Sequence, residues 1–563
     1  MAQPHVDITL TAPGFQGINT EDSPINQDYS FAAEATNCVI DQFGRIGARK
    51  AFATKTSSFS LTYTPAATVD STVTKVHRLS NGAILGQNYV VCTVSVTEYN
   101  DLGAFLAVHY FLAKLSANGS AVEEIATPAL ASPDALVNAD IVFFNDQCLV
   151  FTSGNGPLLW TGTGAATYLS GEAGYQAPID AASQSLTATD EINGDVATAA
   201  YGRLWVTGVD GDYNNIFYSS LLDPTKWYDG SAGALPTNTA GIIDVSEYWP
   251  QGKDRIVNIV AHNNTLVVFG RSSILLFGNP QGDPAAVGGL YLADSVVRLG
   301  LISRDGVVST GQDILFLDDT GVRSLGRTIQ EQAIPVGDLT ANVRKDISIK
   351  IKETSDQSTI SLSYWPEEAL LVCLFSEDST AYVLEMRAPS SSGGMKVSQW
   401  TGCTFERALS FEDEDGAEVL LASSDSQGLL QYAGHAEYGG RVYVMTYTTN
   451  PLALGQSNTL KFPKKFRYIL VSDGTETTAE FRWGFGSSLE YSKSVSIEPT
   501  TTSYWGIAEW GIAQYGKSDA SFLRYDVNAK GSGVYLLLGL RASIQGASMS
   551  LQEINVNTLL GRN

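Results

Sequence analysis

NTLVVFGRSSILLFG, residues 264–278, consists of two short apolar runs separated by a polar turn. Runs of this length, rich in β-branched and aromatic residues and bounded by glycine, predict two buried strands of one hairpin. Six further stretches have the same design. They are NYVVCTVSV with GAFLAVHYFLAKL, DIVFFNDQCLVF with GPLLW, GRLWVTG with NNIFYSS, DILFLDD with TGVRSLG, ALLVCLFSEDS with TAYVLEM, and EVLLASSDS with QGLLQYA.

The copies recur at steps of roughly 50 to 60 residues, close to the ~50 residues of a kelch-like blade with variable loops. The sequence therefore predicts an all-β fold with a β-propeller-like body of five to seven blades. No WD or kelch fingerprint is present, and an ordinary sandwich with irregular hairpins is the alternative. Helix is expected to be a minor component, with one or two turns within residues 328–347 around Pro335.

The pattern changes near residue 440, where longer strands with alternating apolar residues begin, as in KFRYILVSDG. Alternation of this kind is typical of a strand with one buried face, and it predicts a C-terminal β-sandwich over residues 439–563. The propeller-like domain is then expected over residues 61–438. Residues 1–60 predict an N-terminal arm and a hairpin that turns at residues 42–44.

Composition narrows the class of protein. With 44% hydrophobic residues among 563, the chain can bury a large core, whereas its formal charge of −24 argues against a protein that grips phosphate backbones. That charge does not exclude a surface past which DNA slides. The five scattered cysteines indicate small buried thiols. The start of the chain lacks the features of a secretion signal, so we expect synthesis in a cytoplasm without a membrane anchor.

The sequence contains no recognisable catalytic pattern, so we expect neither an enzyme nor a bound cofactor or metal. DGDYNN, residues 210–215, begins like a calcium loop but has Asn215 where that loop requires glycine, and a β-turn is favoured. SSDSQGLLQY resembles the turn of sialidase blades, but Gly428 comes one position late. A propeller glycosidase is therefore only a third alternative.

Two surface features are candidates for interaction. The basic cluster KFPKKFRY includes Lys464 and Lys465, which on an acidic chain favour an acidic neighbour over nucleic acid. The glycine-punctuated repeat YWGIAEWGIAQYG places Trp505, Trp510 and Tyr515 at five-residue steps. Exposed, these rings could stack on sugars or dock a partner, whereas buried they would fasten a long loop to the sandwich.

The stretch NIFYSSLLDPTKW, residues 215–227, predicts a strand followed by a rigid corner. Proline fixes its own φ and keeps the preceding Asp223 extended, so Asp223-Pro224 makes a stiff turn. Trp227 can then cover the edge of a blade, and we include it among the interaction candidates. A stiff loop suits a ring of identical subunits, because a closed head-to-tail interface tolerates little angular error.

Three stretches together resemble one family, the tail nozzle or tail tubular protein B-like proteins of short-tailed bacteriophages. They are APGFQGINTEDSPINQDYSFAAEATNCVIDQFGRIGARKAF near the start, NIFYSSLLDPTKW in the middle, and GVYLLLGLRASIQGASMSLQEINVNTLLGRN at the end. In the first stretch the resemblance lies in Asn37 and in a hairpin with Gly44, Arg45, Arg49 and Lys50, and the last three are interaction candidates.

This resemblance implies a structural protein of the virion tail that forms a homohexamer below the portal and adaptor rings. Its partners would be the adaptor protein and tail fibre or tailspike proteins, and it would retain genomic DNA until ejection without sequence-specific binding. We further hypothesise that acidic residues face the channel and repel the passing phosphates. The alternative from another class is a host-surface carbohydrate-binding tail protein, with the aromatics of residues 504–516 as the contact.

Overall fold

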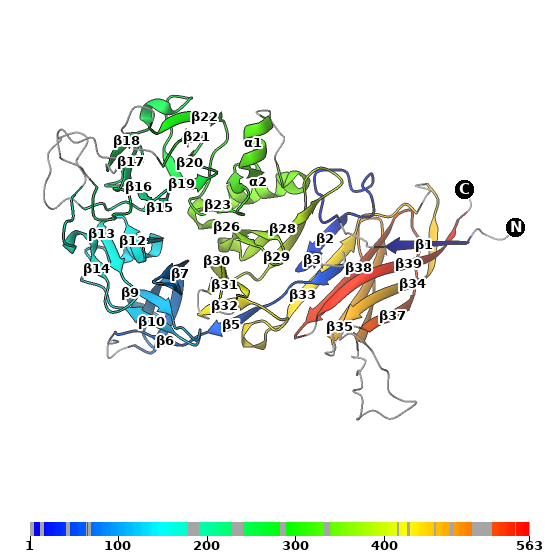
Figure 1. The fold of residues 1–563 in the computed structure, drawn as a ribbon. Coiled ribbons are helices and arrows are strands. Elements are labelled where there is room, and N and C mark those ends of the chain that lie inside the picture. Colours follow the sequence, from blue (N-terminus) through cyan, green and yellow to red (C-terminus); the bar gives the residue numbers. More distant parts are fainter. Residues whose placement is uncertain are drawn as a thin grey trace.

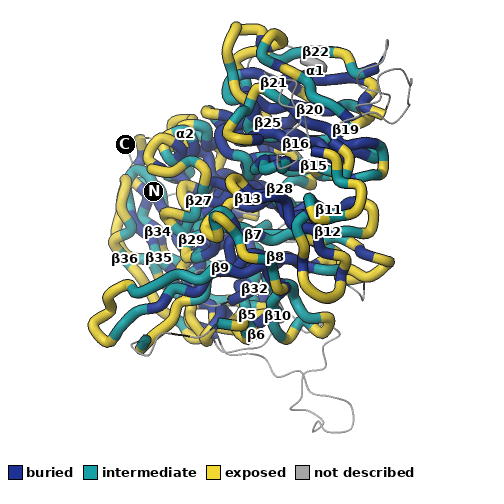
Figure 2. Tube along the Cα trace, turned by 90° about the vertical axis from the view of Figure 1, so that its left-hand side faces the viewer, coloured by how far each residue is buried: buried dark blue, intermediate teal, exposed yellow. Residues whose placement is uncertain are grey.

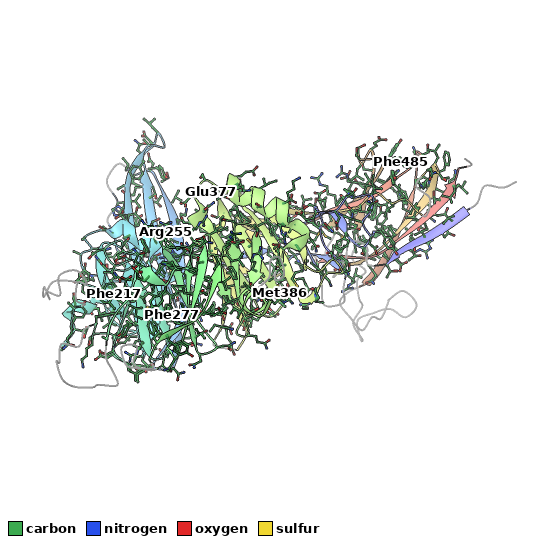
Figure 3. All side chains as sticks on the ribbon, turned by 90° about the horizontal axis from the view of Figure 1, so that it is seen from above. Phe217, Arg255, Phe277, Glu377, Met386 and Phe485 are labelled. Carbon is green, nitrogen blue, oxygen red and sulfur yellow. The ribbon has the colours of Figure 1, made fainter. Side chains whose placement is uncertain are left out.

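The computed structural model describes residues 5–11, 16–40, 45–63, 65, 69–177, 191–227, 240–281, 289–331, 338–413, 416–424, 428–454, 458–472, 477–497, 521–546 and 548–561. Two parts are apparent in Figure 1, a β-propeller that runs from blue to yellow and a β-sandwich at the right, where both termini lie. Figure 3 shows the same division from above, with Phe217 and Phe277 in the propeller and Phe485 near the opposite end.

The propeller consists of seven blades within the described residues. In chain order they are β7(Ser71–Ile84), β8(Gln87–Tyr99), β9(Phe105–Leu115), β10(Val122–Ile125) and β6(Phe59–Ser60); β11(Asp140–Phe144), β12(Gln147–Thr152), β13(Asn155–Trp160) and β14(Thr167–Tyr168); β15(Val196–Ala200), β16(Arg203–Thr207), β17(Asn215–Tyr218) and β18(Gly241–Asp244); β19(Ile256–His262), β20(Thr265–Gly270), β21(Ser273–Gly278) and β22(Tyr291–Val297); β23(Val307–Ser309), β24(Ile314–Asp318) and β25(Gly321–Ser324); β26(Ile360–Trp365), β27(Leu370–Phe375), β28(Thr380–Pro389) and β29(Met395–Thr401); and β30(Phe405–Glu412), β31(Glu418–Ser424), β32(Leu429–Tyr432) and β5(Phe52–Thr56).

The first strands of the blades form the inner ring. Strand β7 contacts β11, β11 contacts β15, β15 contacts β19, β23 contacts β26, β26 contacts β30, and β30 returns to β7. The fourth and fifth blades are joined at the same level by a hydrogen bond of 2.6 Å from Asn258 Nδ2 to the carbonyl oxygen of Arg304. The ring is therefore closed. All seven repeat copies supply the second and third strands of a blade, so the predicted propeller is confirmed with seven blades.

Tight turns between inner strands follow from short polar sequences. Asn145 and Asp146 between β11 and β12 both have positive φ, 49° and 59°, as do Asn263 and Asn264 between β19 and β20, 43° and 59°. Two central residues with positive φ make a type I′ turn, whose twist matches that of the flanking strands, and asparagine and aspartate tolerate this conformation best. The polar turn residues between the strands thus set the register of the hairpins.

The core of the propeller lies between neighbouring blades. Strands β20 and β21 are buried at every residue except Thr265, with one face against the third blade and the other against the fifth. This explains why the repeats read as continuous apolar runs, since a strand buried on both faces needs no alternation. Figure 2 shows the same distribution, with buried residues in the strands and exposed residues at the turns.

An early strand closes the last blade. Strand β5 pairs antiparallel with β32 as the outermost strand, so the end of the ring is held by residues from its beginning. On the inner side of this seam, Glu406 accepts hydrogen bonds from Lys75 Nζ at 2.6 Å and His77 Nδ1 at 3.2 Å. Burial opposes ionisation of Glu406, but the hydrogen bonds from His77 and Lys75 outweigh burial and lower its pKa to about 2. The closing contact is therefore ionic as well as apolar.

The predicted C-terminal sandwich is confirmed, and it includes strands from both ends of the chain. Its strands are β1(His5–Thr11), β2(Ala32–Thr36), β3(Cys38–Ile40), β4(Ile46–Ala48), β33(Tyr443–Thr449), β34(Lys461–Ser472), β35(Thr477–Phe485), β36(Tyr491–Ile497), β37(Ser521–Asn528), β38(Leu536–Ile544) and β39(Met549–Leu560). Aromatic residues join the two layers, as where Tyr468 stacks on Phe481 with ring centroids 4.2 Å apart. These pairs belong to the largest apolar cluster of the molecule.

Residues 1–60 do not form the separate arm that the sequence predicted. Strand β1 pairs with β39, β2 lies between β29 and β33, β3 and β4 extend the sheet of β39, and β5 closes the propeller. The predicted hairpin is present as the antiparallel pair β3 and β4, and its turn lies outside the described residues. The N-terminal segment was misjudged because its pairing partners are hundreds of residues away, where local periodicity carries no signal.

A single nine-stranded sheet runs from the sixth blade into the sandwich, in the order β26-β27-β28-β29-β2-β33-β38-β35-β36. Helices are few among the described residues, with α1(Leu325–Glu331) after the three-stranded fifth blade and α2(Arg344–Glu353) before the sixth. The expectation that helix is a minor component is confirmed. All five cysteines are free and buried, as predicted.

Candidate functional site

The inner strands surround a cavity of about 200 Å³ on the propeller axis. Blades one, two, four, five, six and seven all contribute to its lining. The residues that line it are Arg78, Leu79, Ser80, Ala139, Asp140, Ile141, Asn258, Arg304, Asp305, Val307, Ser361, Leu362, Ser363, Arg407 and Ala408. A second cavity of about 480 Å³ shares Arg78, Arg304 and Asp305 with the first and is also lined by residues of the third blade. The shared residues form a wall common to both cavities.

Asp305 is the centre of an ion-paired cluster in this wall. Its Oδ1 accepts a hydrogen bond of 2.6 Å from Arg78 Nη1, and its Oδ2 accepts one from Arg407 Nη1. Burial would raise the pKa of Asp305, but the guanidinium groups of Arg407 and Arg78 outweigh it and hold the pKa below its usual value. One ionised carboxylate therefore ties together the first, fifth and seventh blades.

Two further charged residues face the cavity. Arg304 donates hydrogen bonds only to main-chain carbonyls, those of Asp195 and of Asn138 at 2.9 Å, and pairs with no carboxylate among the described residues. Asp140 accepts a hydrogen bond of 2.9 Å from the main-chain N–H of Ala197. Burial raises the pKa of Asp140 to about 6 despite that hydrogen bond and the nearby Arg78. The lining thus combines three cations with two acids, one of them reluctant to ionise.

The axial cluster offers cations and ion pairs, and its serine hydroxyl groups are engaged within the chain. Its hydroxyl groups are turned to main-chain carbonyls, with Ser80 donating to Ile141 and Ser363 donating to Ala408. Nucleophilic catalysis needs a hydroxyl or thiol beside a base, and no such pair occurs in the described part of this cavity. Over the described ranges, no group of three or more His, Cys, Asp or Glu side chains could hold a metal ion.

The structure brings two predicted residues together. Arg45 and Lys50 line a cavity of about 350 Å³ between the propeller and the sandwich, together with Arg387. Lys50 Nζ lies 2.8 Å from Glu368 Oε1 and 4.5 Å from the ring centroid of Trp365. Lys50 is therefore already neutralised within the chain, and it is a weaker candidate for a partner contact than the sequence indicated.

Arg49 is buried, although the sequence marked it as an interaction candidate. Its side chain is 1% exposed and forms a salt bridge of 2.7 Å with Glu437 Oε1. Its Nε donates to Asn37 Oδ1 at 3.1 Å, and its guanidinium carbon lies 4.4 Å from the ring centroid of Tyr443 and 5.7 Å from that of Trp400. Arg49 is inaccessible to a partner because it joins the propeller to the sandwich from inside.

Trp227 is also unavailable for interaction. Its side chain is 1% exposed and packs between the second and third blades, in a cluster that includes Phe151 and Leu204. The corner before it forms as predicted, since Asp223 Oδ1 accepts hydrogen bonds from the main-chain N–H and the hydroxyl of Thr225, at 2.9 and 2.6 Å. The rigid corner therefore places the Trp227 side chain between the second and third blades.

The remaining candidates lie on or beyond the described surface of the sandwich. Lys464 is exposed on β34, and the Nζ of Lys465 pairs with Asp526 Oδ2 at 2.7 Å. The role of Lys464 and Lys465 in binding a partner therefore stays a prediction. Trp505, Trp510 and Tyr515 lie outside the described residues.

Sequence reasoning missed Arg78, Arg304, Asp305 and Arg407. A signal was present, because HRL, SRD and FER place charged residues within or just before the first strand of a blade. Apart from DIVFF, which is β11, the first strands were not distinguished from loops, since the repeat was defined on the more apolar second and third strands. Charged residues at that position of a propeller repeat point to its axis.

Comparisons with known proteins add little beyond the fold. No family model and no curated protein match the chain. The WD40 domain of Neurospora crassa Pan2 is 6% identical over 63% of this chain and 88% of that domain, with a TM-score of 0.30. The β-propeller domain of Vanderwaltozyma polyspora Nup133 is 9% identical over 70% of this chain and 91% of that domain, with a TM-score of 0.25.

A third structure is the extracellular domain of a putative hybrid two-component system of B. thetaiotaomicron. It is 11% identical, with a TM-score of 0.30, over 74% of this chain and 43% of that one, so the chain spans less than half its length. At these TM-scores none of the three structures supports an inference about function. In the described part of the chain, no helix is both long and apolar enough to span a membrane.

Proposed function

We propose that the chain is a subunit of the tail nozzle of a short-tailed bacteriophage, a structural conduit that retains the genome and lets it out. In this proposal six copies surround the tail axis below the portal and adaptor rings, and tail fibre or tailspike proteins attach around them. The protein works by assembly and gating and performs no chemistry. The resemblance of residues 12–52, 215–227 and 533–563 to that family supports it.

The observation that carries the proposal is the nine-stranded sheet shared by the sixth blade and the sandwich. A chain with two independent domains would be joined by a linker, across which relative motion is expected. Here β2 pairs with β29 on one side and β33 on the other, so main-chain hydrogen bonds cross the junction. Arg49 adds a buried ion pair at the same place. A fixed angle between the two parts is what a closed ring of identical subunits requires.

In this proposal the DNA channel lies between subunits and not along the propeller axis. The axial cavity of about 200 Å³ has room for about seven water molecules at ~30 Å³ each. Arg78, Asp305 and Arg407 also connect three blades across the axis. A duplex could therefore pass only through a larger opening formed by several copies, where the acidic balance of −24 would favour sliding over adhesion.

The experiment is to measure the mass of the purified protein by light scattering, alone and with a portal–adaptor assembly, followed by negative-stain imaging. We expect a sixfold ring with a central hole, either in solution or only on the assembly. A monomer or trimer that ignores the assembly and binds cells would refute the proposal and favour the carbohydrate-binding alternative. Replacing Trp505 and Trp510 by alanine separates the two, because only a receptor-binding protein would lose cell attachment with assembly intact.

A further inference from the structure

We infer that the axial cavity of the propeller is a binding site for a small oxygen anion of the phosphate or carboxylate class, held by Arg78, Arg304 and Arg407. This inference goes beyond the conduit proposal and does not depend on it. It rests on the charge of the lining, on unused hydrogen-bond donors, and on the size of the cavity.

The lining carries more positive than negative charge on a strongly acidic chain. Three guanidinium groups face the cavity, against the carboxylates of Asp140 and Asp305. Asp305 is already shared between Arg78 and Arg407, and Arg304 has only neutral main-chain partners in the described structure. Arg304 is half-buried, and an anion in the cavity would give its guanidinium group the ionic partner that it lacks among the described residues.

The arginines also keep donors that a ligand could use. Arg78 has a side chain 10% exposed, and its Nε has no hydrogen-bond partner among the described residues. Arg407 is paired through Nη1 to Asp305, and its side chain is 18% exposed. Guanidinium groups bind carboxylate and phosphate through two parallel N–H donors, so such donors suit a ligand with several acceptor oxygens.

Arg49 provides an internal comparison. It is at least as buried as Arg78, yet its Nε, Nη1 and Nη2 donate to Asn37, to the carbonyl oxygen of Lys50 and to Glu437. All three nitrogen atoms of the Arg49 guanidinium therefore have partners within the chain. Arg78 differs from Arg49 at Nε, and solvent reaches the axial cluster, because the Asp305 side chain between Arg78 and Arg407 is 22% exposed.

The size of the cavity selects the ligand. Pockets for drug-sized molecules measure about 300–1,000 Å³, and the axial cavity is smaller at about 200 Å³. It can hold an oxygen anion with several waters. The larger neighbouring cavity is also lined by Arg78, Arg304 and Asp305, so these residues can be reached from both cavities.

The test is isothermal titration calorimetry of the full chain with inorganic phosphate and with malonate, at an ionic strength matched by sodium chloride. We expect saturable binding of at least one probe at one site per chain. Arg304→Gln should weaken it about 10- to 100-fold, because a hydrogen bond to a charged group contributes about 1.5–3 kcal/mol. Arg304→Lys retains the charge, so its affinity for the anion should lie between that of the unmodified chain and that of Arg304→Gln.

The control is Arg524→Gln, since Arg524 is 57% exposed on the sandwich and outside both cavities. Near-UV circular dichroism establishes that each variant is folded. Binding of phosphate alone would identify the phosphate class, and binding of malonate alone the carboxylate class. Absence of binding by both probes would overturn the inference. Binding that Arg304→Gln leaves unchanged, or that Arg524→Gln weakens equally, would also overturn it, since the anion would then be bound elsewhere.

Discussion

Replacing Arg49 by methionine tests whether the buried cation holds the propeller and the sandwich together. The substitution keeps most of the apolar volume but leaves the Glu437 carboxylate, whose side chain is 6% exposed, without its partner at 2.7 Å. Removing one partner of a buried ion pair costs about 3–5 kcal/mol, because an uncompensated charge stays buried. In the double variant Arg49→Met with Glu437→Gln no buried charge is left, and we expect a loss of only about 1–2 kcal/mol.

Urea unfolding followed by tryptophan fluorescence measures both values, and Trp400 beside Arg49 reports on the junction. The variant Arg441→Gln is the control, because Arg441 lies on the exposed side of Tyr438. The reasoning is refuted if Arg49→Met costs less than about 1 kcal/mol, or if the double variant is no more stable than the single one. Loss of partner binding without loss of stability would restore Arg49 as an interface residue.

Three further predictions concern the ring and its axis. Glu406→Gln should lower the free energy of unfolding by up to about 3 kcal/mol at pH 7 and by little at pH 2. The lowered pKa of Glu406 adds stability above pH ~4, and this stability is lost as the pH falls toward 2. Equal losses in urea titrations at acid and neutral pH would contradict this. Asp140→Asn should leave stability unchanged at pH 4 and raise it by up to about 3 kcal/mol at pH 8. The raised pKa of Asp140 means that its ionisation destabilises the folded state as the pH rises, and asparagine cannot ionise. A variant less stable than the parent at pH 8 would disprove this. Gly428→Ala should lower stability by about 1–3 kcal/mol more than Gly434→Ala. Both residues have positive φ, but only at Gly428 would the added Cβ lie 2.2 Å from the Thr56 carbonyl oxygen. Equal melting temperatures of the two variants would show that β5 shifts to accommodate the Cβ.

The blades could be predicted from the sequence because their information is local. Apolar runs such as 265–270 and 273–278 are adjacent in the chain and pair with each other, so length, residue type and turn chemistry determine them. The predicted range of five to seven blades narrows to seven only through the contacts of the first strands. Those strands are short or carry charges, as in β30 with Glu406 and Arg407, and do not stand out from loops.

The role of the first residues could not be predicted, because it depends on pairing over long distances. Thr9 bonds to Asn555, 546 residues later in the sequence, and no periodicity within either segment indicates the other. The choice of Arg49 and Trp227 as interaction candidates was misleading for a related reason. Residue type alone gives a preference for surface or core, and the neighbours that bury these two side chains come from distant strands.

The pairing of β1 with β39 also has a consequence for synthesis. At about 5–20 residues per second, the ribosome takes roughly half a minute to two minutes to make the 546 residues that separate Thr9 from Asn555. Strands β1, β3 and β4 must wait through that interval with unpaired edges, and β5 must wait for β32. A nascent chain that stops early therefore has neither a complete sandwich nor, before β32, a closed ring. Only chains translated through β39 can therefore complete the sheet that joins β1, β4 and β34.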